Sequence, residues 1–530
     1  MNMPKRAGSQ RLLSNLALAI SIVIVGLVAV AASIVMALLL PSSTALAATK
    51  ADAIGADAAR HLLGRTGFST AEVEIAKLAS LNRLEAAQLV VRPAIEAAIL
   101  PSPAWVDEPP VTPKSLQMSG REAQEMNRKI NNERTMELRD WWMGNMLQTE
   151  TPLAEKMTLF WHNHFATSQQ KVRIANVVYA QNVLFRKQAL GNFDTLLREL
   201  SRDPAMLIYL DSVNSKKEAP NENFAREVME LFSLGEGNYT EQDIKEAARA
   251  FTGWSVDRET GKYMFRRGAH DFGKKTIFGK TGNFDGDQVI DLILAKPEAA
   301  QFITRKLWRE FVSPTPDEVE VKRLAHILQS SGYDLTKLMQ AMLTSDAFYA
   351  LDNRGVLIKS PIEFVVGTIK TFNVKPTNVR PFVLQSGVLG QNLFLPPNVK
   401  GWPGGEVWIN SASLLNRKQM LDRLFGTEDR MEAVMASMDT MAEMNGETLP
   451  TKDARIARRM ERTMGGVQMN LPAFAKSFAR AEGEAAMRRV VLAIAPVNSP
   501  RIGAGATVLG EDQALLTLRH LVNDPVYQLK

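Results

Sequence analysis

The chain has 530 residues, of which 45% are hydrophobic and 23% are charged, values typical of globular proteins that exclude disorder over most of its length. The formal net charge is +6, and three of these positive charges belong to Lys5, Arg6 and Arg11 at the very start. The body carries only the other three, and so small an excess argues against a nucleic-acid partner. The chain has no cysteine, which excludes disulfides, thiolate catalysis and cysteine-ligated metal clusters.

The first 47 residues have the order of a secretory signal. Basic residues precede an apolar run over 16–40, and the small residues Ala45-Leu46-Ala47 follow as a cleavage site. The apolar run is also long enough to cross a bilayer. We therefore expect residues 1–47 to be a cleaved signal peptide or an N-terminal membrane anchor formed by 16–40. In both cases the body is exported, to the periplasm or beyond, and touches the membrane only through this segment.

Most of the remaining chain has the periodicity of helices. Helical patterns cover residues 120–149, 153–165, 184–201, 224–234, 241–251, 298–312, 318–331, 334–344, 412–425 and 428–444. Strand patterns are few, although the Gly-rich stretch 263–284 has room for a hairpin. We expect a mainly α fold, in which a large multi-helix domain over 52–425 has irregular Gly- and Pro-rich loops and few or no strands. A Met-rich helical portion over 426–530 is expected to pack on it.

Capping residues predict where several helices begin. Asn221 is a suitable N-cap for the helix that follows it, and Thr240 with Asp243 has the spacing of a helix start. Asp287 is expected to cap the helix of residues 289–294.

His162 and His164 form a His-x-His pair after Trp161. Imidazoles are common ligands of divalent transition metals, so the pair is a candidate metal site. Residues two apart on a helix point about 200° apart, so both histidines can face one metal only where the helix ends. The alternative is that the neighbouring aromatic residues pack inward and the histidines hydrogen-bond to backbone at the helix end.

The segment 221–227 (NENFARE) is the densest polar motif in the chain. On a helix capped by Asn221, Glu222 and Arg226 form an i,i+4 pair. Glu222 and Glu227 are candidate catalytic carboxylates, with Glu227 as a general base or a metal ligand, and Arg226 is a candidate binding residue. A structural Glu–Arg network inside a helical core is the alternative interpretation.

His270 and Asp271 lie next to each other in the irregular stretch and are further candidate metal ligands. A His–Asp pair is a weak pattern, because an aspartate beside a histidine also orients the ring or forms a turn. Trp402 and Trp408 lie in a loop rich in proline and glycine. They are candidate binding residues for a sugar ring or a partner, or they attach a long loop to the core.

Five stretches carry a family resemblance. They are 61–68 (HLLGRTGF), 152–169 (PLAEKMTLFWHNHFATSQ), 220–254 (PNENFAREVMELFSLGEGNYTEQDIKEAARAFTGW), 357–368 (LIKSPIEFVVGT) and 395–409 (LPPNVKGWPGGEVWI). Together they resemble the bacterial family called domain of unknown function 1800, over roughly residues 56–530. The resemblance implies an exported protein, and it implies a second exported envelope protein as a partner. It implies no settled activity.

Two classes of function follow. We expect an exported cell-envelope protein that acts as a helical scaffold or partner-binding protein, with its Trp402–Trp408 loop on an exposed face. The alternative is a periplasmic metal-dependent enzyme, hydrolytic in type, with one divalent metal held by His162, His164, His270 and Asp271. That alternative requires the His-x-His, Glu227 and His270 segments to converge in one pocket.

Overall fold

The computed structural model describes residues 52–95, 99–112, 115–257, 259–425, 470–480, 482–497 and 510–530. The chain divides into two compact units, Met1–Asp52 and Ala53–Lys530. The predicted signal or anchor segment, 1–47, lies outside the described residues. Among the residues that are described, no helix is both long and apolar enough to cross a bilayer.

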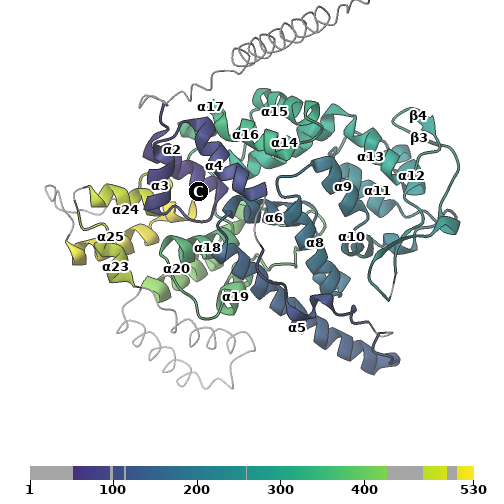
Figure 1. Cartoon of the computed structure of the whole chain (residues 1–530), viewed down its shortest axis with the longest axis horizontal. Helices are drawn as coiled ribbons and strands as arrows, with labels where there is room; N and C mark the ends of the chain where they lie inside the picture. The colour runs from purple at the N-terminus through teal and green to yellow at the C-terminus, as the bar shows by residue number, and fades with distance from the viewer. Residues whose placement is uncertain are drawn as a thin grey trace, which may run out of the picture. The chain divides into compact units, whose positions relative to one another are not determined.

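The second unit is built almost entirely of helices, as predicted (Figure 1). Its first helices are packed on one another, α2 and α3 most closely, and α4 lies against α16 from much later in the chain. These elements are α2 (Gly55–Thr66), α3 (Glu72–Ala79), α4 (Arg83–Ile95), the short helix η1 (Ala104–Asp107) and the long α5 (Gly120–Gln148).

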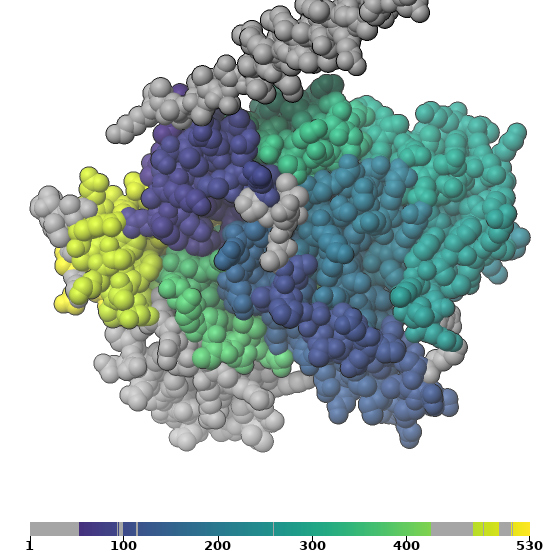
Figure 2. All heavy atoms as spheres, in the orientation of Figure 1, coloured from purple at the N-terminus to yellow at the C-terminus, as the bar shows by residue number. Residues whose placement is uncertain are grey.

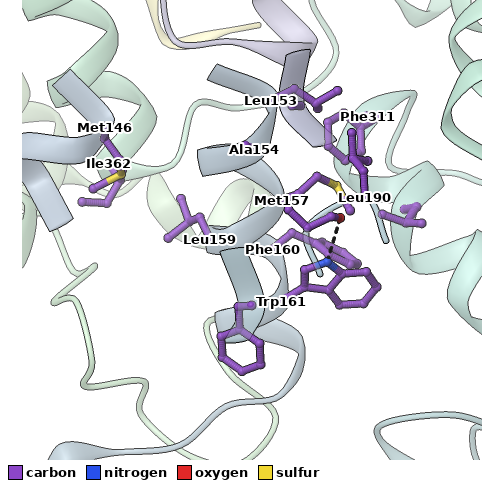
Figure 3. Close-up of a cluster of buried hydrophobic side chains, with 14 of the residues drawn as sticks. Met146, Leu153, Ala154, Met157, Leu159, Phe160, Trp161, Leu190, Phe311 and Ile362 are labelled. Carbon is purple, nitrogen blue, oxygen red and sulfur yellow. Dashed lines mark hydrogen bonds between the residues drawn. The ribbon is translucent and has the colours of Figure 1, made fainter. Parts of the chain in front are cut away.

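The middle of the unit surrounds α6 (Pro152–His164), which contacts α2, α4, α5 and α8. Apolar side chains leave α6 on several sides, among them Leu153, Met157 and Trp161, each at most 1% exposed (Figure 3). The indole Nε1 of Trp161 donates to the carbonyl of Ala189, 3.1 Å away. A helix that is apolar around much of its circumference belongs in a core, and α6 is the helix on which the histidines lie.

The elements that follow α6 are short. They are α7 (Gln169–Val172), α8 (Ala175–Lys187), α9 (Phe193–Ser201), α10 (Pro204–Tyr209), η2 (Ser212–Asn214), α11 (Glu222–Glu230) and α12 (Glu241–Ala250). The pattern over 184–201 suggested continuous helix, but the chain breaks between α8 and α9, where the Asn192 side chain accepts from the backbone N–H of Thr195 and starts a new helix. The predicted caps at Asn221 and at Thr240 with Asp243 are both present.

Two small antiparallel sheets interrupt the helices after α12. One pairs β1 (Trp254–Val256) with β2 (Tyr263–Phe265), and the other is a hairpin of β3 (Lys275–Ile277) and β4 (Lys280–Gly282). The hairpin turns at Phe278 and Gly279, both with positive φ, as a tight two-residue turn requires. The stretch 263–284 therefore contains the hairpin for which its composition left room.

Helices α13 to α17 continue from the hairpin. They and the short helices beside them are η3 (Arg267–Ala269), α13 (Gly286–Leu294), α14 (Pro297–Phe311), α15 (Glu318–Ser330), α16 (Leu335–Thr344), α17 (Asp346–Tyr349) and η4 (Leu351–Asn353). The predicted cap at Asp287 is wrong. Asp285 caps α13 in a reciprocal capping box with Gln288, whereas Asp287 forms an ion pair with Arg202.

The last helices return to the first ones. These are α18 (Pro361–Thr371), α19 (Arg380–Val388), η5 (Gly405–Trp408), α20 (Ser411–Phe425), α23 (Leu471–Lys476), α24 (Gly483–Val491), α25 (Glu511–Asn523) and η6 (Pro525–Gln528). Helix α24 contacts α2, and Arg489 on α24 forms an ion pair of 2.9 Å with Asp57. The space-filling view shows the yellow C-terminal segment beside the purple N-terminal helices (Figure 2). The boundary predicted at 426 lies next to residues that are not described.

Candidate functional site

His162 and His164 point away from each other, because α6 continues through both of them. The ring of His162 packs against Trp142, Phe394 and Trp402. The ring of His164 instead stacks on Phe160. Burial lowers the pKa of each histidine to about 3, so both imidazoles are neutral at physiological pH.

The hydrogen bonding of His164 fixes its tautomer. Its Nε2 lies 3.1 Å from the carbonyl oxygen of Phe232, which can only accept, so Nε2 carries the proton. The other ring nitrogen, Nδ1, is then an acceptor, and it is buried without a partner. The Nε2 of His162 is also buried without a partner. Unpartnered buried polar atoms are uncommon in native proteins and are concentrated at functional sites.

A pocket of about 580 Å³ opens beside His164. Its wall combines the end of α6, the last turns of α14, the segment before α18 and the loop around Trp402. Five cationic side chains line it, namely Lys156, Lys306, Arg309, Lys400 and Lys530, against three carboxylates, Glu310, Glu363 and Glu406. We call this space the cationic pocket.

The floor of the cationic pocket is a buried network of ion pairs. Glu363 accepts from Lys156 and from Lys530, each at 2.5 Å, and Lys530 also reaches Glu310 at 3.0 Å. Burial alone would raise the pKa of Glu363, but the two ammonium groups hold it well below its ordinary value. Burial lowers the pKa of Lys156 to about 8 in spite of its carboxylate partner. The floor is therefore a charged structure stabilised by its own pairing.

The rim of the cationic pocket is different. Within the described part of the chain, Lys306, Arg309 and Lys400 form no ion pair within 4 Å, although all three line the pocket. Burial lowers the pKa of Lys306, and repulsion from Arg309 and Lys400 lowers it further. Three like charges thus line one pocket, and none of them forms a direct ion pair with a carboxylate in the described residues.

The loop that carries Lys400 is fixed to α6 by a residue between the two histidines. Asn163 Oδ1 accepts from the backbone N–H of Trp402 at 2.7 Å, and Asn163 Nδ2 donates to its carbonyl at 3.2 Å. Gly401 has φ +78°, and a Cβ there would lie 2.4 Å from the backbone oxygen of Asn163. Only glycine fits so close an approach of two backbones.

The two tryptophans of this loop line the cationic pocket while remaining largely buried. Trp402 is 5% exposed and Trp408 is 7% exposed. The two rings attach the loop to the core, which is the second interpretation given for them above, while residues 403 and 405–407 of the same loop are exposed. What the loop presents to the pocket is a combination of aromatic surface with the charge of Lys400.

Glu227 lies in the second turn of α11, next to the backbone that holds His164. Its carbonyl accepts from the N–H of Phe232, the residue whose own carbonyl bonds His164. The side-chain Oε2 of Glu227 is buried and has no hydrogen-bond partner. Burial and the neighbouring Glu230 raise its pKa, against the opposite effect of Lys400. Glu227 is thus close enough to sense Lys400 but is not part of the pocket wall.

Glu222 and Arg226 belong to a partly exposed ion-pair network. Arg226 donates to both oxygens of Glu241 at 2.8 Å and reaches Glu222 at 3.5 Å. The i,i+4 pair is present as predicted, but Arg226 is shared with a second helix. Neither Glu222 nor Arg226 lines the cationic pocket.

His270 and Asp271 have partners of their own near α12. His270 Nδ1 donates to the carbonyl of Thr252 at 2.8 Å, and Asp271 is bound by Arg249 at 2.7 Å. These contacts are not shared with His162, His164 or Glu227. Among the described residues no group of three or more His, Asp or Glu side chains is arranged to hold a metal ion. The metal-dependent alternative required the His-x-His, Glu227 and His270 segments to meet in one pocket, and in the described residues they do not.

Sequence reasoning missed the cations of the pocket. Lys156 and Lys400 lie within the motifs of 152–169 and 395–409. A lysine is not a distinctive sequence signal, however, when no acidic residue lies three or four positions away from it. Lys306 and Arg309 are three apart on α14 and face the same side, a signal that becomes visible only when the loop at 400 is placed opposite. Asn163 was passed over for the histidines on either side of it.

Comparison with known proteins agrees with the motifs. The family model described as "Protein of unknown function (DUF1800)" matches residues 61–528. No curated protein and no solved structure matches the chain significantly. The matched range includes the histidines of α6, the cations of α14 and the loop of Trp402. A match over nearly the whole chain shows that this protein belongs to the DUF1800 family.

Proposed function

We propose that this protein is a non-catalytic binding protein of the cell envelope, and that its cationic pocket holds an anionic group of its ligand. The observation that carries the proposal is the rim of Lys306, Arg309 and Lys400, three cations around one pocket without an ion pair in the described part of the chain. Their mutual repulsion costs stability in the free protein, and an anion would offset it.

The chemistry of the rim favours a carboxylate or a phosphate. The ammonium groups of Lys306 and Lys400 are point charges, and the guanidinium of Arg309 offers a planar fork that matches either anion. Charge-assisted hydrogen bonds of this type are about twice as strong as neutral ones.

The rest of the pocket suits the body of a small molecule or the end of a polymer chain. Its volume of about 580 Å³ is within the usual range for ligand sites. Phe160, Trp402 and Trp408 supply aromatic wall, and an aromatic face is a good surface for a sugar ring. The ligand class is therefore an anionic sugar, either free or at the end of an envelope polymer or partner glycan.

The envelope location rests on the predicted export signal at 1–47. A partner in the same compartment, such as a second exported protein, could present the anionic group to the pocket. Binding to such a partner and binding to the free sugar then compete for the same three cations.

Titration calorimetry of the full chain tests the proposal, with glucose 6-phosphate and galacturonate as anionic probes and glucose as the neutral control. We expect binding of an anionic probe, no binding of glucose, and about tenfold weaker binding in Lys306→Met, the loss of one charge-assisted contact. The matched control is Lys322→Met, which removes an exposed lysine from α15. Equal binding by both variants, or no binding of either anion by the wild type, would overturn the proposal.

Glu227 favours a hydrolytic enzyme as the second candidate, because its half-buried carboxyl has one buried, unpartnered oxygen and a raised pKa, as a general acid requires. Release of nitrophenol from p-nitrophenyl phosphate and p-nitrophenyl glucuronide measures this activity. An enzyme would turn over one of them and lose that turnover in Glu227→Gln while still binding galacturonate. No turnover by the wild type would leave the binding function alone.

A further inference from the structure

A second, much smaller cavity lies behind the floor of the cationic pocket. Its volume is about 30 Å³, enough for one water molecule or one monoatomic ion. Its lining includes the charged side chains of Arg60, Lys359, Lys530 and Glu363. Lys530 and Glu363 line both spaces, so the two are separated by the ion pairs of the floor.

The surroundings of this cavity hold more positive than negative charge. Arg65 and Arg417 are both fully buried and add to the field of Arg60 and Lys359, whereas Glu363 and Glu310 are the carboxylates that act on this group. Glu363 is already occupied by Lys156 and Lys530. An excess of buried positive charge is costly unless something neutralises it.

Outside the cavity wall, Arg65 Nε and Nη1 and Arg417 Nε are buried with no hydrogen-bond partner, so they add positive charge to the surroundings without lining the cavity. Lys359 Nζ donates to the carbonyl of Tyr527 at 2.7 Å and is a triple donor with no acceptor capacity of its own. Burial lowers the pKa of Lys359 well below its ordinary value, and Arg60 and Arg417 lower it further.

We propose that the cavity between Arg60, Lys359 and Lys530 is a binding site for a monoatomic anion of the size of chloride. Its volume excludes an anionic sugar, and its polar lining offers mainly N–H donors of cationic groups. A water molecule would accept from these donors without reducing the charge, whereas a halide does both. The bound ion keeps Lys359 protonated and stabilises the floor against which the cationic pocket is built.

Melting temperature in chloride and in methanesulfonate at matched ionic strength tests this site in the full chain. Methanesulfonate is too large for the cavity and is not an anionic sugar, so chloride should raise the melting temperature of the wild type by about 2 °C in a saturable way. Lys359→Met should lose this difference, and the exposed-surface control Lys322→Met should keep it. Lys306→Met should also keep it, which separates this site from the cationic pocket.

Crystals grown in bromide give a second readout that does not depend on a variant folding. An anomalous peak within hydrogen-bond distance of Lys359 Nζ and the Arg60 guanidinium is the expected result. A cavity without a peak, or a melting temperature that is identical in chloride and methanesulfonate, overturns the proposal. In that case Lys359 is neutral and a water molecule occupies the space.

Discussion

The cationic pocket and the region of His270 use similar residues in opposite ways. Around His270 the half-buried and buried charges have partners, because Arg249 joins Asp271 to Glu246 and Lys275 Nζ donates to the carbonyl of Asp271. Around His164 the rim cations lack ion pairs in the described residues, and Nδ1 of the ring has no partner. Both regions were candidate metal sites as sequence motifs, although the His–Asp pair was the weaker pattern. What distinguishes them is whether the polar groups are satisfied, and unsatisfied groups indicate where a ligand binds.

The floor of the cationic pocket resembles the region of His270, because its charged groups are paired with one another. Breaking its ion pairs should therefore give the largest loss of stability. Glu363→Gln removes the carboxylate shared by Lys156 and Lys530 and leaves two buried ammonium groups facing each other. We expect a loss of about 3–5 kcal/mol in the free energy of unfolding, measured by urea denaturation. Glu318→Gln, at an exposed pair with Arg305, should change it by less than about 0.5 kcal/mol. Similar losses in both variants would show that burial of the pair does not matter.

Disturbing the attachment of the Trp402 loop to α6 should give the next largest loss of stability. In Gly401→Ala the new Cβ meets the backbone oxygen of Asn163, which cannot yield, and φ is positive as well. We expect a loss of about 2–3 kcal/mol by the same measurement, together with weaker binding of anions, because Lys400 moves with the loop. Gly404→Ala is the control, since its φ is +73° but nothing lies within 4 Å of the added Cβ. It should lose only about 1 kcal/mol.

These glycines also show how far the sequence could predict the fold. Helices α11 and α12 and their caps follow from local signals, since Asn221 and Thr240 act on residues two or three positions away. The cap of α13 was misplaced because Asp285 and Asp287 are both suitable, and only Gln288 completes the box with Asp285. The close approach of Gly401 to Asn163 joins residues far apart in the chain, and no local pattern predicts it.

The site was less predictable than the fold for the same reason. His164 could be singled out as a residue type, and Glu227 could be placed on a helix. The pocket, however, depends on Lys306 and Lys400, which are far apart in the chain, lining the same space without direct ion pairs in the described residues. Pairing over long sequence distances is decided by tertiary packing, which periodicity does not encode.

Asp271→Asn tests the region of His270, where the polar groups have hydrogen-bond partners. Arg249 and the backbone N–H of Gly273 hold the pKa of Asp271 below its ordinary value. Its ionised form therefore stabilises the fold above the pKa of the unfolded chain, and this contribution is lost as pH falls through the lowered pKa of the folded protein. We expect a loss of about 1 kcal/mol at neutral pH and no difference from wild type in strong acid, measured by denaturation across pH.

Glu227→Gln should raise stability at neutral pH, whereas Asp271→Asn lowers it. The raised pKa of Glu227 means that the folded protein favours the protonated carboxyl, so the ionised group lowers stability at neutral pH. We expect a small increase in melting temperature at pH 7 that disappears as pH falls below the raised pKa. A decrease at pH 7 would place Glu227 among the satisfied structural carboxylates.

We propose that the rim of Lys306, Arg309 and Lys400 binds an anion. A crystal soaked in tungstate is the direct test. Tungstate resembles phosphate and has a strong anomalous signal. We expect an anomalous peak in the cationic pocket, in contact with Lys306 and Lys400. This peak should disappear in the double variant Lys306→Met/Lys400→Met. A pocket without tungstate, or a peak that persists unchanged in the double variant, would contradict it.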